Sequence, residues 1–285
     1  MKSMLFIPAD NDRKLAKAST SDADALAFDL EDAVLPARKA IARQMLVECL
    51  KTYAGRSQVW IRVNDLASGE LLADLAAVIA SRPVGIVLPK ILGPECIERV
   101  SHYLDMAETT AGLPLGSTGI VAVCTETPAA VLRMGELSRG SFPRLRGLSW
   151  GGEDLSSAMG AGDPRAPDGS WRPVYEHART QCLLIAHTLG VEAIDTVYVD
   201  FRDADGCRNN TLTARHDGFT GKIAIHPDQV PIINAAFTPS AAELARAERV
   251  IAAFDSGAGA IQMDGKMLDV PHLKAARRLL AAADR

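Results

Sequence analysis

Short apolar segments rich in β-branched residues recur along the chain. Each is nearly continuously apolar, without polar residues at alternate positions, which is typical of strands buried on both faces of a parallel sheet. Eight such strands are predicted, over Ser3–Pro8, Ala25–Glu31, Val59–Val63, Gly85–Lys90, Gly119–Glu126, Leu145–Gly151, Ala193–Val199 and Gly221–His226.

Helical patterns lie between these strands. Arg38–Leu50 and Gly69–Ala80 carry apolar residues at i, i+3 and i+4, and Trp171–Leu189 does so with Gly190 as its stop. Eight strand–helix alternations over about 225 residues predict a (β/α)8 barrel. A doubly wound α/β sheet is the alternative, but its first strand usually leads into a glycine-rich turn, whereas this chain has Pro8–Asp12 there.

The residues after the eighth strand exceed what one closing helix needs. We therefore expect a barrel domain over residues 1–236 and a C-terminal lid over residues 237–285. Ser240 and Glu243 have the spacing of a capping box. The predicted elements of the lid are a helix over Ser240–Phe254, a hinge over Ser256–Ala260, a hairpin over Met263–Asp269 and a helix over Pro271–Ala283.

Composition narrows the class of protein. Hydrophobic residues make up 48% and charged residues 23%, which is typical of a globular chain. The net charge of −4 argues against a nucleic-acid-binding surface. No apolar run has the length of a membrane helix or a signal peptide. The five cysteines form no Cys-x-x-Cys pair, so we expect reduced thiols and a cytoplasmic enzyme.

Polar residues stand where the apolar strands end, and barrel enzymes place their chemistry at the carboxyl ends of the strands. Glu126 and Asp154 follow neighbouring strands, and two such carboxylates can hold Mg²⁺ while leaving positions open for substrate. The alternatives are an ion pair of Glu126 with Arg62 or Lys90, and a helix-capping role for Asp154.

Other strand ends allow two interpretations as well. Arg62 either clamps a substrate carboxylate or pairs with Glu31 or Asp32, and Lys90 has the same two interpretations. The residues Gly151-Gly152 either bring backbone N–H groups close to an oxyanion or form a plain turn. His226 is either a ligand or a hydrogen-bonded structural residue.

Taken in order, these segments resemble a known family. The residues that carry the resemblance are Ser3–Pro8, Phe28–Val34, Ile61–Asn64, Leu88–Lys90, Thr125–Pro128, Gly151–Leu155, Ala193–Asp195, Tyr198–Asp203, Gly221-Lys222, Ile225–Pro227, Phe237–Ser240 and Asp264–His272. They are similar to the citrate lyase β-subunit-like branch of the HpcH/HpaI aldolase and citrate lyase superfamily. One departure is Pro8-Ala9-Asp10, where that family commonly has Pro-Gly-Asn.

The resemblance implies roles for individual residues. Glu126 and Asp154 would bind Mg²⁺, with Mn²⁺ as an alternative ion, and Arg62 would hold a keto-acid carboxylate. Asp269 would act as acid and base in the site of a neighbouring subunit, which implies a homotrimer or hexamer. The other implied contacts are Glu31 and Asp32 to metal-bound waters, the amides of Gly152 and Glu153 to the keto acid, and Lys14, Lys90, Lys222, His226 and Pro227 to coenzyme A.

The implied reaction is retro-Claisen cleavage of a 3-hydroxyacyl-CoA, of the citramalyl-CoA or malyl-CoA type, to acetyl-CoA and an α-keto acid. Other functions stay open at this point. They are a citrate lyase β subunit acting on citryl-acyl carrier protein within a larger complex, a metal-dependent hydroxy-keto-acid aldolase, a malyl-CoA thioesterase, and a non-catalytic protein that binds coenzyme A.

Overall fold

The computed structural model describes residues 1–167, 169–255 and 259–283. The chain divides into two compact units, Met1–Asn234 and Ala235–Arg285. The boundary predicted between residues 236 and 237 lies inside helix α9 (Gln229–Phe237). Within the described residues, no helix is long and apolar enough to cross a membrane.

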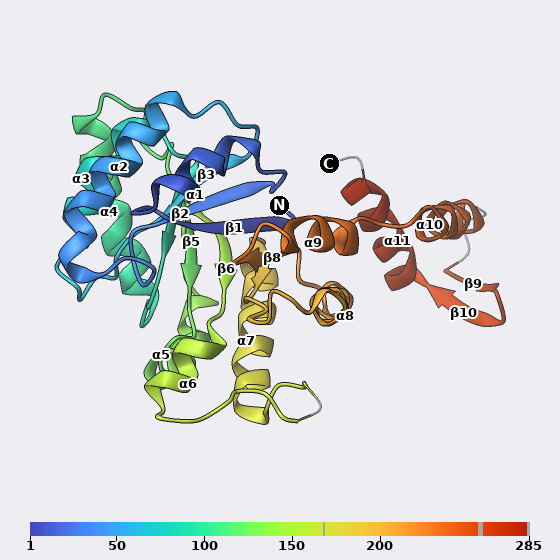
Figure 1. Cartoon of the computed structure of the whole chain (residues 1–285). Coiled ribbons are helices and arrows are strands. Elements are labelled where there is room, and N and C mark those ends of the chain that lie inside the picture. Colours follow the sequence, from blue (N-terminus) through green and yellow to red (C-terminus); the bar gives the residue numbers. More distant parts are fainter. Residues whose placement is uncertain (168, 256–258, 284–285) are drawn as a thin grey trace. The chain divides into compact units, whose positions relative to one another are not determined.

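The first unit is built on eight parallel strands that close into a barrel (Figure 1). Each strand pairs with the next along the chain, and β1 closes the ring by pairing with β8. This confirms the predicted (β/α)8 barrel. The strands are β1 (Ser3–Pro8), β2 (Ala25–Asp29), β3 (Gln58–Arg62), β4 (Gly85–Leu88), β5 (Gly119–Val123), β6 (Leu145–Ser149), β7 (Glu192–Asp195) and β8 (Gly221–Ala224).

Helices follow the strands and surround the barrel (Figure 1). The predicted stop of α7 at Gly190 is confirmed, since this residue is left-handed with φ 68°. The helices of the barrel unit are α1 (Asp12–Lys17), η1 (Ala18–Thr20), η2 (Pro36–Arg38), α2 (Lys39–Thr52), α3 (Leu71–Val78), η3 (Ile79–Ser81), α4 (Pro94–Thr110), α5 (Pro128–Leu137), α6 (Gly152–Ala158), α7 (Pro173–Leu189) and α8 (Ala204–Asp217), with α9 reaching the second unit.

Alternate strand residues fill the barrel interior. One buried cluster joins Met4, Ala25, Ala27, Trp60, Val87, Val121, Val123, Ile194 and Ile223. Trp60 needs a glycine beside it, because a Cβ on Gly85 would lie 2.4 Å from its ring. Since strand side chains alternate between the two faces, Asp29 and Arg62 continue the inward-facing rows of Ala27 and Trp60 at the carboxyl ends of β2 and β3.

The second unit contains α10 (Ala241–Phe254), the antiparallel hairpin β9 (Ala260–Met263) with β10 (Lys266–Asp269), and α11 (Val270–Ala283). The capping box of Ser240 and Glu243 is present, as predicted. The predicted hairpin is confirmed, but residues 256–258 of the predicted hinge lie outside the described residues. The buried core of this unit consists of Ala247, Val250, Phe254, Leu268 and Ala276.

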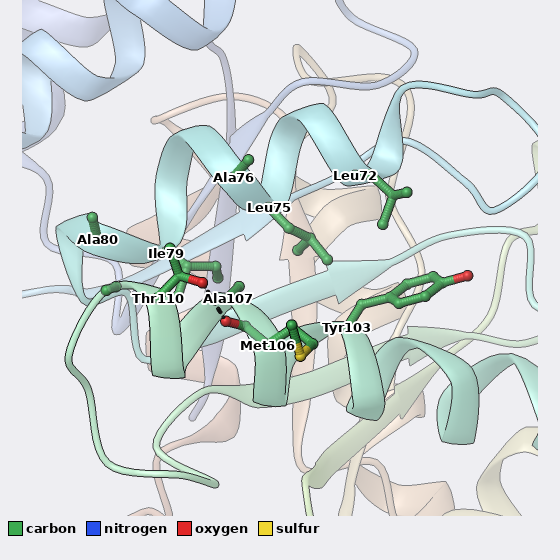
Figure 2. A pocket seen from close by; sticks show the side chains of 10 residues that line it. Leu72, Leu75, Ala76, Ile79, Ala80, Tyr103, Met106, Ala107 and Thr110 are labelled. Carbon is green, nitrogen blue, oxygen red and sulfur yellow. Dashed lines mark hydrogen bonds between the residues drawn. The ribbon is translucent and has the colours of Figure 1, made fainter.

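An apolar groove of about 360 Å³ runs along the outside of the barrel between α3 and α4. Leu72, Leu75 and Ile79 line it from one side, and Tyr103 and Met106 from the other (Figure 2). None of its lining residues is a predicted site residue.

Candidate active site

The strands end before the apolar segments do. The prediction placed Glu31, Lys90 and Glu126 inside strands, whereas the pairing stops at Asp29, Leu88 and Val123. These polar residues therefore lie on the loops at the carboxyl ends of β2, β4 and β5. Loops at this edge of a parallel barrel are where side chains can meet a ligand.

Arg62 lies in a cluster of opposite charges. Its Nε and Nη2 donate to the two oxygens of Asp29 at 2.8 and 2.5 Å, and its Nη1 lies 3.0 Å from Glu31 Oε2. The Lys90 ammonium pairs with Glu31 and lies 3.0 Å from Asp32. Arg62 and Lys90 therefore both form the ion pairs that were one of their two interpretations. The two hydrogen bonds of Arg62, however, go to Asp29, which was not among its expected partners.

Asp29 is a member of this cluster that the sequence reasoning did not single out. Its position two residues after Ala27, on the inward row of β2, is the signal that would have found it. Its two oxygens also accept from the backbone N–H groups of Glu31 and Ala33, so it organises the whole loop.

Arg62 and Glu31 still have hydrogen-bonding groups that can bind an anion and a water molecule. An arginine has five N–H donors, of which two donate to Asp29, so donors of Arg62 remain for a substrate carboxylate. Burial raises the pKa of Glu31, while the neighbouring charge of Arg62 opposes that rise. Oε2 of Glu31 is buried and, within the described residues, accepts no hydrogen bond of good geometry.

Lys90 connects this cluster to Glu126. It is a non-glycine residue with φ 53°, a left-handed conformation that costs about 1–3 kcal/mol and is concentrated at functional sites. In this conformation its backbone N–H donates to Glu126 Oε2 while its ammonium reaches Glu31. Nothing in the sequence around Lys90 indicates this conformation.

Glu126 and Asp154 come close to each other beside Gly151. A Cβ placed on Gly151 would lie 2.9 Å from Glu126 Cγ and 3.6 Å from Asp154 Oδ2. Burial and the negative charge of Asp154 raise the pKa of Glu126 to about 8, against the backbone N–H of Lys90. The predicted ion pairs of Glu126 with the side chains of Arg62 and Lys90 are not seen among the described residues.

These two carboxylates fit a divalent cation of the magnesium type. Their mutual repulsion in a buried position is what a shared cation relieves. Within the residues that the structure describes, no three His, Cys, Asp or Glu side chains gather as metal ligands. Two carboxylates with open positions match Mg²⁺, which keeps several waters and seldom occupies an all-protein cage.

The turn that carries Asp154 is held by aromatic packing. Helix α6 begins at Gly152 with Gly151 as its N-cap, so Asp154 lies in the first turn and does not cap the helix. Trp150 packs edge-on against Trp171 at a centroid distance of 4.7 Å. A Cβ on Gly152 would lie 3.1 Å from both rings, so this close approach requires glycine and leaves backbone amides at the helix start.

A cavity of about 630 Å³ opens beside the ends of β1 and β8. It brings together three of the five residues predicted to contact coenzyme A, namely Lys14, His226 and Pro227. The ring of His226 also stacks on Phe201 at 4.7 Å. Lys90 does not line this cavity and lies in the carboxylate cluster instead.

Lys222 is placed differently from its prediction. It is 1% exposed, and its ammonium donates to Asp195 Oδ2 at 2.7 Å and to the carbonyl of Thr196 at 2.6 Å. Asp195 also accepts from Trp150 Nε1 at 2.8 Å. This burial argues against the predicted contact of Lys222 with coenzyme A, and it assigns the residue a structural ion pair.

We expect Lys222→Met to lower the free energy of unfolding by about 3 kcal/mol, because the buried Asp195 loses the ammonium that donates to it and retains Arg179 at 3.5 Å. Chemical denaturation would measure this. Lys51→Met is the matched control, since Lys51 pairs with Glu48 on the surface and should change stability by less than about 0.5 kcal/mol. Equal stability of the two variants would show that the buried pair contributes little.

Asp269 lies in the second unit, at the end of β10. Its Oδ1 lies 2.6 Å from Nδ1 of His272, and both side chains are about half exposed, at 54% and 51%. The sequence reasoning singled out Asp269 but not His272.

Comparisons with known proteins show which family and which structures the chain resembles. The family model described as HpcH/HpaI aldolase/citrate lyase matches residues 2–227. A (3S)-malyl-CoA thioesterase of Cereibacter sphaeroides is 36% identical, covering 99% of this chain and 94% of that protein. The mitochondrial citramalyl-CoA lyase of Rattus norvegicus is 32% identical over 99% of this chain and 86% of its own length.

A solved structure is similar over the same extent. The protein CitE from Mycobacterium tuberculosis, in complex with magnesium, acetoacetate and coenzyme A, has a TM-score of 0.84. It is 30% identical, and the match covers 100% of this chain and 98% of that one.

Proposed function

The chain belongs to the HpcH/HpaI aldolase/citrate lyase family, and we propose that it is a Mg²⁺-dependent lyase that cleaves a 3-hydroxyacyl-CoA to acetyl-CoA and an α-keto acid. The observation that carries this proposal is that Glu126 and Asp154 both lie within 4 Å of the position of a Cβ on Gly151, at the barrel mouth. The substrate we favour is of the citramalyl-CoA or malyl-CoA type, since relatives named for both are similar over the whole chain.

Glu126 and Asp154 would hold the metal ion. When bound, the ion supplies a Lewis acid for a substrate oxygen. Glu31 and Asp32 would order nearby water molecules. Oε2 of Glu31 supports this for Glu31, because within the described residues it accepts no hydrogen bond of good geometry and has only the ion-pair contact with Arg62. The backbone amides of Gly152 and Glu153 would donate to the keto acid.

Arg62 would orient the substrate through its carboxylate. Asp29 fixes the guanidinium from one side, and the Phe6 ring lies 4.8 Å from its central carbon. Because its direction is already set, the guanidinium loses little entropy when its remaining donors bind the carboxylate of the substrate.

Asp269 would move the proton, acting in the site of a neighbouring copy of the chain. Cleavage of the C–C bond leaves the enolate of the thioester, and the carboxylic acid of Asp269 would give its proton to the enolate carbon. The reverse reaction takes the same proton from the acetyl methyl group. This role makes the chain an oligomer, which we propose to be a trimer or hexamer.

The cavity beside β1 and β8 would receive the coenzyme A portion. Lys14, with Lys17 on the same wall, gives it positive charge that suits the phosphates of coenzyme A. The Phe201–His226 stack offers a flat aromatic surface next to it.

A second function has support from one comparison. Since a (3S)-malyl-CoA thioesterase is 36% identical, the same site could direct water to the thioester carbonyl instead of breaking the C–C bond. The products separate the two reactions, because a thioesterase releases free coenzyme A and a hydroxy acid.

Mass spectrometry of the purified protein with Mg²⁺ and each of four thioesters tests the proposal. The substrates are citramalyl-, malyl-, β-methylmalyl- and citryl-CoA. We expect acetyl-CoA with pyruvate from the first, or acetyl-CoA with glyoxylate from the second. Free coenzyme A together with the intact hydroxy acid would contradict the lyase and support the thioesterase. No conversion of any thioester would contradict both functions.

Gly151, beside the two carboxylates, provides a test of the assigned metal ligands. In Gly151→Ala the new methyl carbon would lie 2.9 Å from Glu126 Cγ, so the glutamate must move. We expect the Mg²⁺ concentration for half-maximal activity to rise about 10–100-fold, as for other disturbed metal ligands. Gly135→Ala is the matched control, because its Cβ meets no atom within 4 Å. An unchanged metal requirement in Gly151→Ala would contradict the assigned ligands.

A further inference from the structure

We propose that His272 is a positioning residue for the proton-transferring carboxylate Asp269, an inference that rests on the proposed lyase function. The two side chains meet at 2.6 Å between His272 Nδ1 and Asp269 Oδ1. Among the described residues, this is the one hydrogen-bond contact of the Asp269 side chain.

The start of α11 explains why the carboxylate stays available. Asp269 directly precedes the helix, where an aspartate usually accepts from the N–H of the second or third helical residue. The second residue is Pro271, which has no N–H, and the third is His272 itself. Within the described residues the N–H of His272 makes no hydrogen bond to the Asp269 carboxylate, and the histidine ring takes the place of the usual backbone donor.

The ring also fixes which oxygen is free. With a proton on Nδ1, the ring donates to Oδ1, and Oδ2 is then the oxygen that can carry a proton to carbon. When Nδ1 has no proton, it can accept the backbone N–H of Asp269, which lies 3.2 Å away. The tautomer with the proton on Nδ1 is the one that holds the carboxylate, so it is the tautomer that this role requires.

Among the described residues, no lysine or arginine of this unit forms an ion pair with Asp269. Arg246 and Arg249 lie 3.9 and 3.5 Å from Asp264, on the hairpin turn. Asp269 is therefore paired with an imidazole ring on its own turn instead of a flexible arginine. A fixed carboxylate is what proton transfer needs, because a misplacement of about 1 Å costs about 10²-fold in rate.

The chemistry balances without any further reactant. In cleavage the substrate hydroxyl gives up its proton to solvent, the C–C bond breaks and its electron pair forms the enolate. The O–H bond of Asp269 then breaks as a C–H bond forms at the enolate carbon, and Asp269 becomes a carboxylate that accepts from His272 Nδ1. A proton taken up from solvent restores the carboxylic acid. In condensation the carboxylate removes the proton again. His272 neither gains nor loses a proton in this cycle.

Three variants of the full chain test the proposal with the thioester that the parent cleaves. His272→Leu should lower kcat about 10²-fold, while KM and the Mg²⁺ requirement stay within about twofold of the parent. His272→Asn should recover most of kcat, because an asparagine amide can donate from near the place of Nδ1. His102→Leu, an exposed histidine on α4, is the control and should match the parent.

The outcomes separate the inference from the function. A parent that cleaves no thioester would overturn both. If the parent is active and His272→Leu is equally fast, or His272→Asn is as slow as His272→Leu, only the role of His272 is overturned. In an Asp269→Asn background, His272→Leu should cause no further loss, since the two residues act as one unit.

Discussion

Replacing Glu126 with glutamine should reduce Mg²⁺-dependent cleavage by about 10³-fold, which corresponds to several kcal/mol of lost metal assistance. The substitution keeps the size of the side chain and its acceptor for the Lys90 backbone N–H, but removes one of the two charges beside Gly151. Binding of Mn²⁺, followed by electron paramagnetic resonance, should weaken in parallel.

Glu98→Gln is the matched control, because Glu98 is an exposed glutamate on α4. It should bind Mn²⁺ and turn over like the parent. If Glu126→Gln kept both parental Mn²⁺ affinity and parental rate, the ion would have to be held elsewhere in the chain, and the assigned pair would be wrong.

Replacing Asp269 with asparagine should slow the C–C step by about 10²–10⁴-fold, the range expected for loss of a general acid and base. Metal affinity should not change, since Asp269 belongs to the second unit and Glu126 and Asp154 to the first. Rapid-quench measurement of acetyl-CoA formation separates this step from product release.

A mixture of variants also tests whether Asp269 works in a neighbouring copy. Asp269→Asn chains mixed with Glu126→Gln chains should regain activity if subunits exchange, because an intact Glu126 site can then receive an intact Asp269. Full turnover by Asp269→Asn alone would remove this residue from the mechanism.

The sequence predicted the barrel because each of its strands is a buried, continuous apolar segment. Residues that face the barrel interior alternate along each strand with residues that face outward. This explains why Asp29 and Arg62 stand at the ends of inward-facing rows. The sequence predicted Glu126 and Asp154 as neighbours because the carboxyl ends of adjacent parallel strands meet at one edge of the barrel.

Other features depended on facts that one sequence does not contain. Lys222 and Ile223 are consecutive residues of β8, so their side chains point to opposite faces of the strand. Ile223 belongs to the interior cluster, and Lys222 points away from it toward its buried partner Asp195. The sequence does not show which face of a strand a lysine occupies. The left-handed Lys90 is imposed by its contacts to Glu31 and Glu126. The pairing of His272 with Asp269 depends on the helix start at Val270.

The most direct test of the account is the release of acetyl-CoA by the parent protein before and after removal of the metal. With citramalyl-CoA or malyl-CoA and Mg²⁺, acetyl-CoA and α-keto acid should form in equal amounts, stop when a chelator is added, and resume when Mg²⁺ is restored. Acetyl-CoA formation that continues at the same rate in the chelator would contradict the assignment of Glu126 and Asp154 as the metal-binding centre of the lyase.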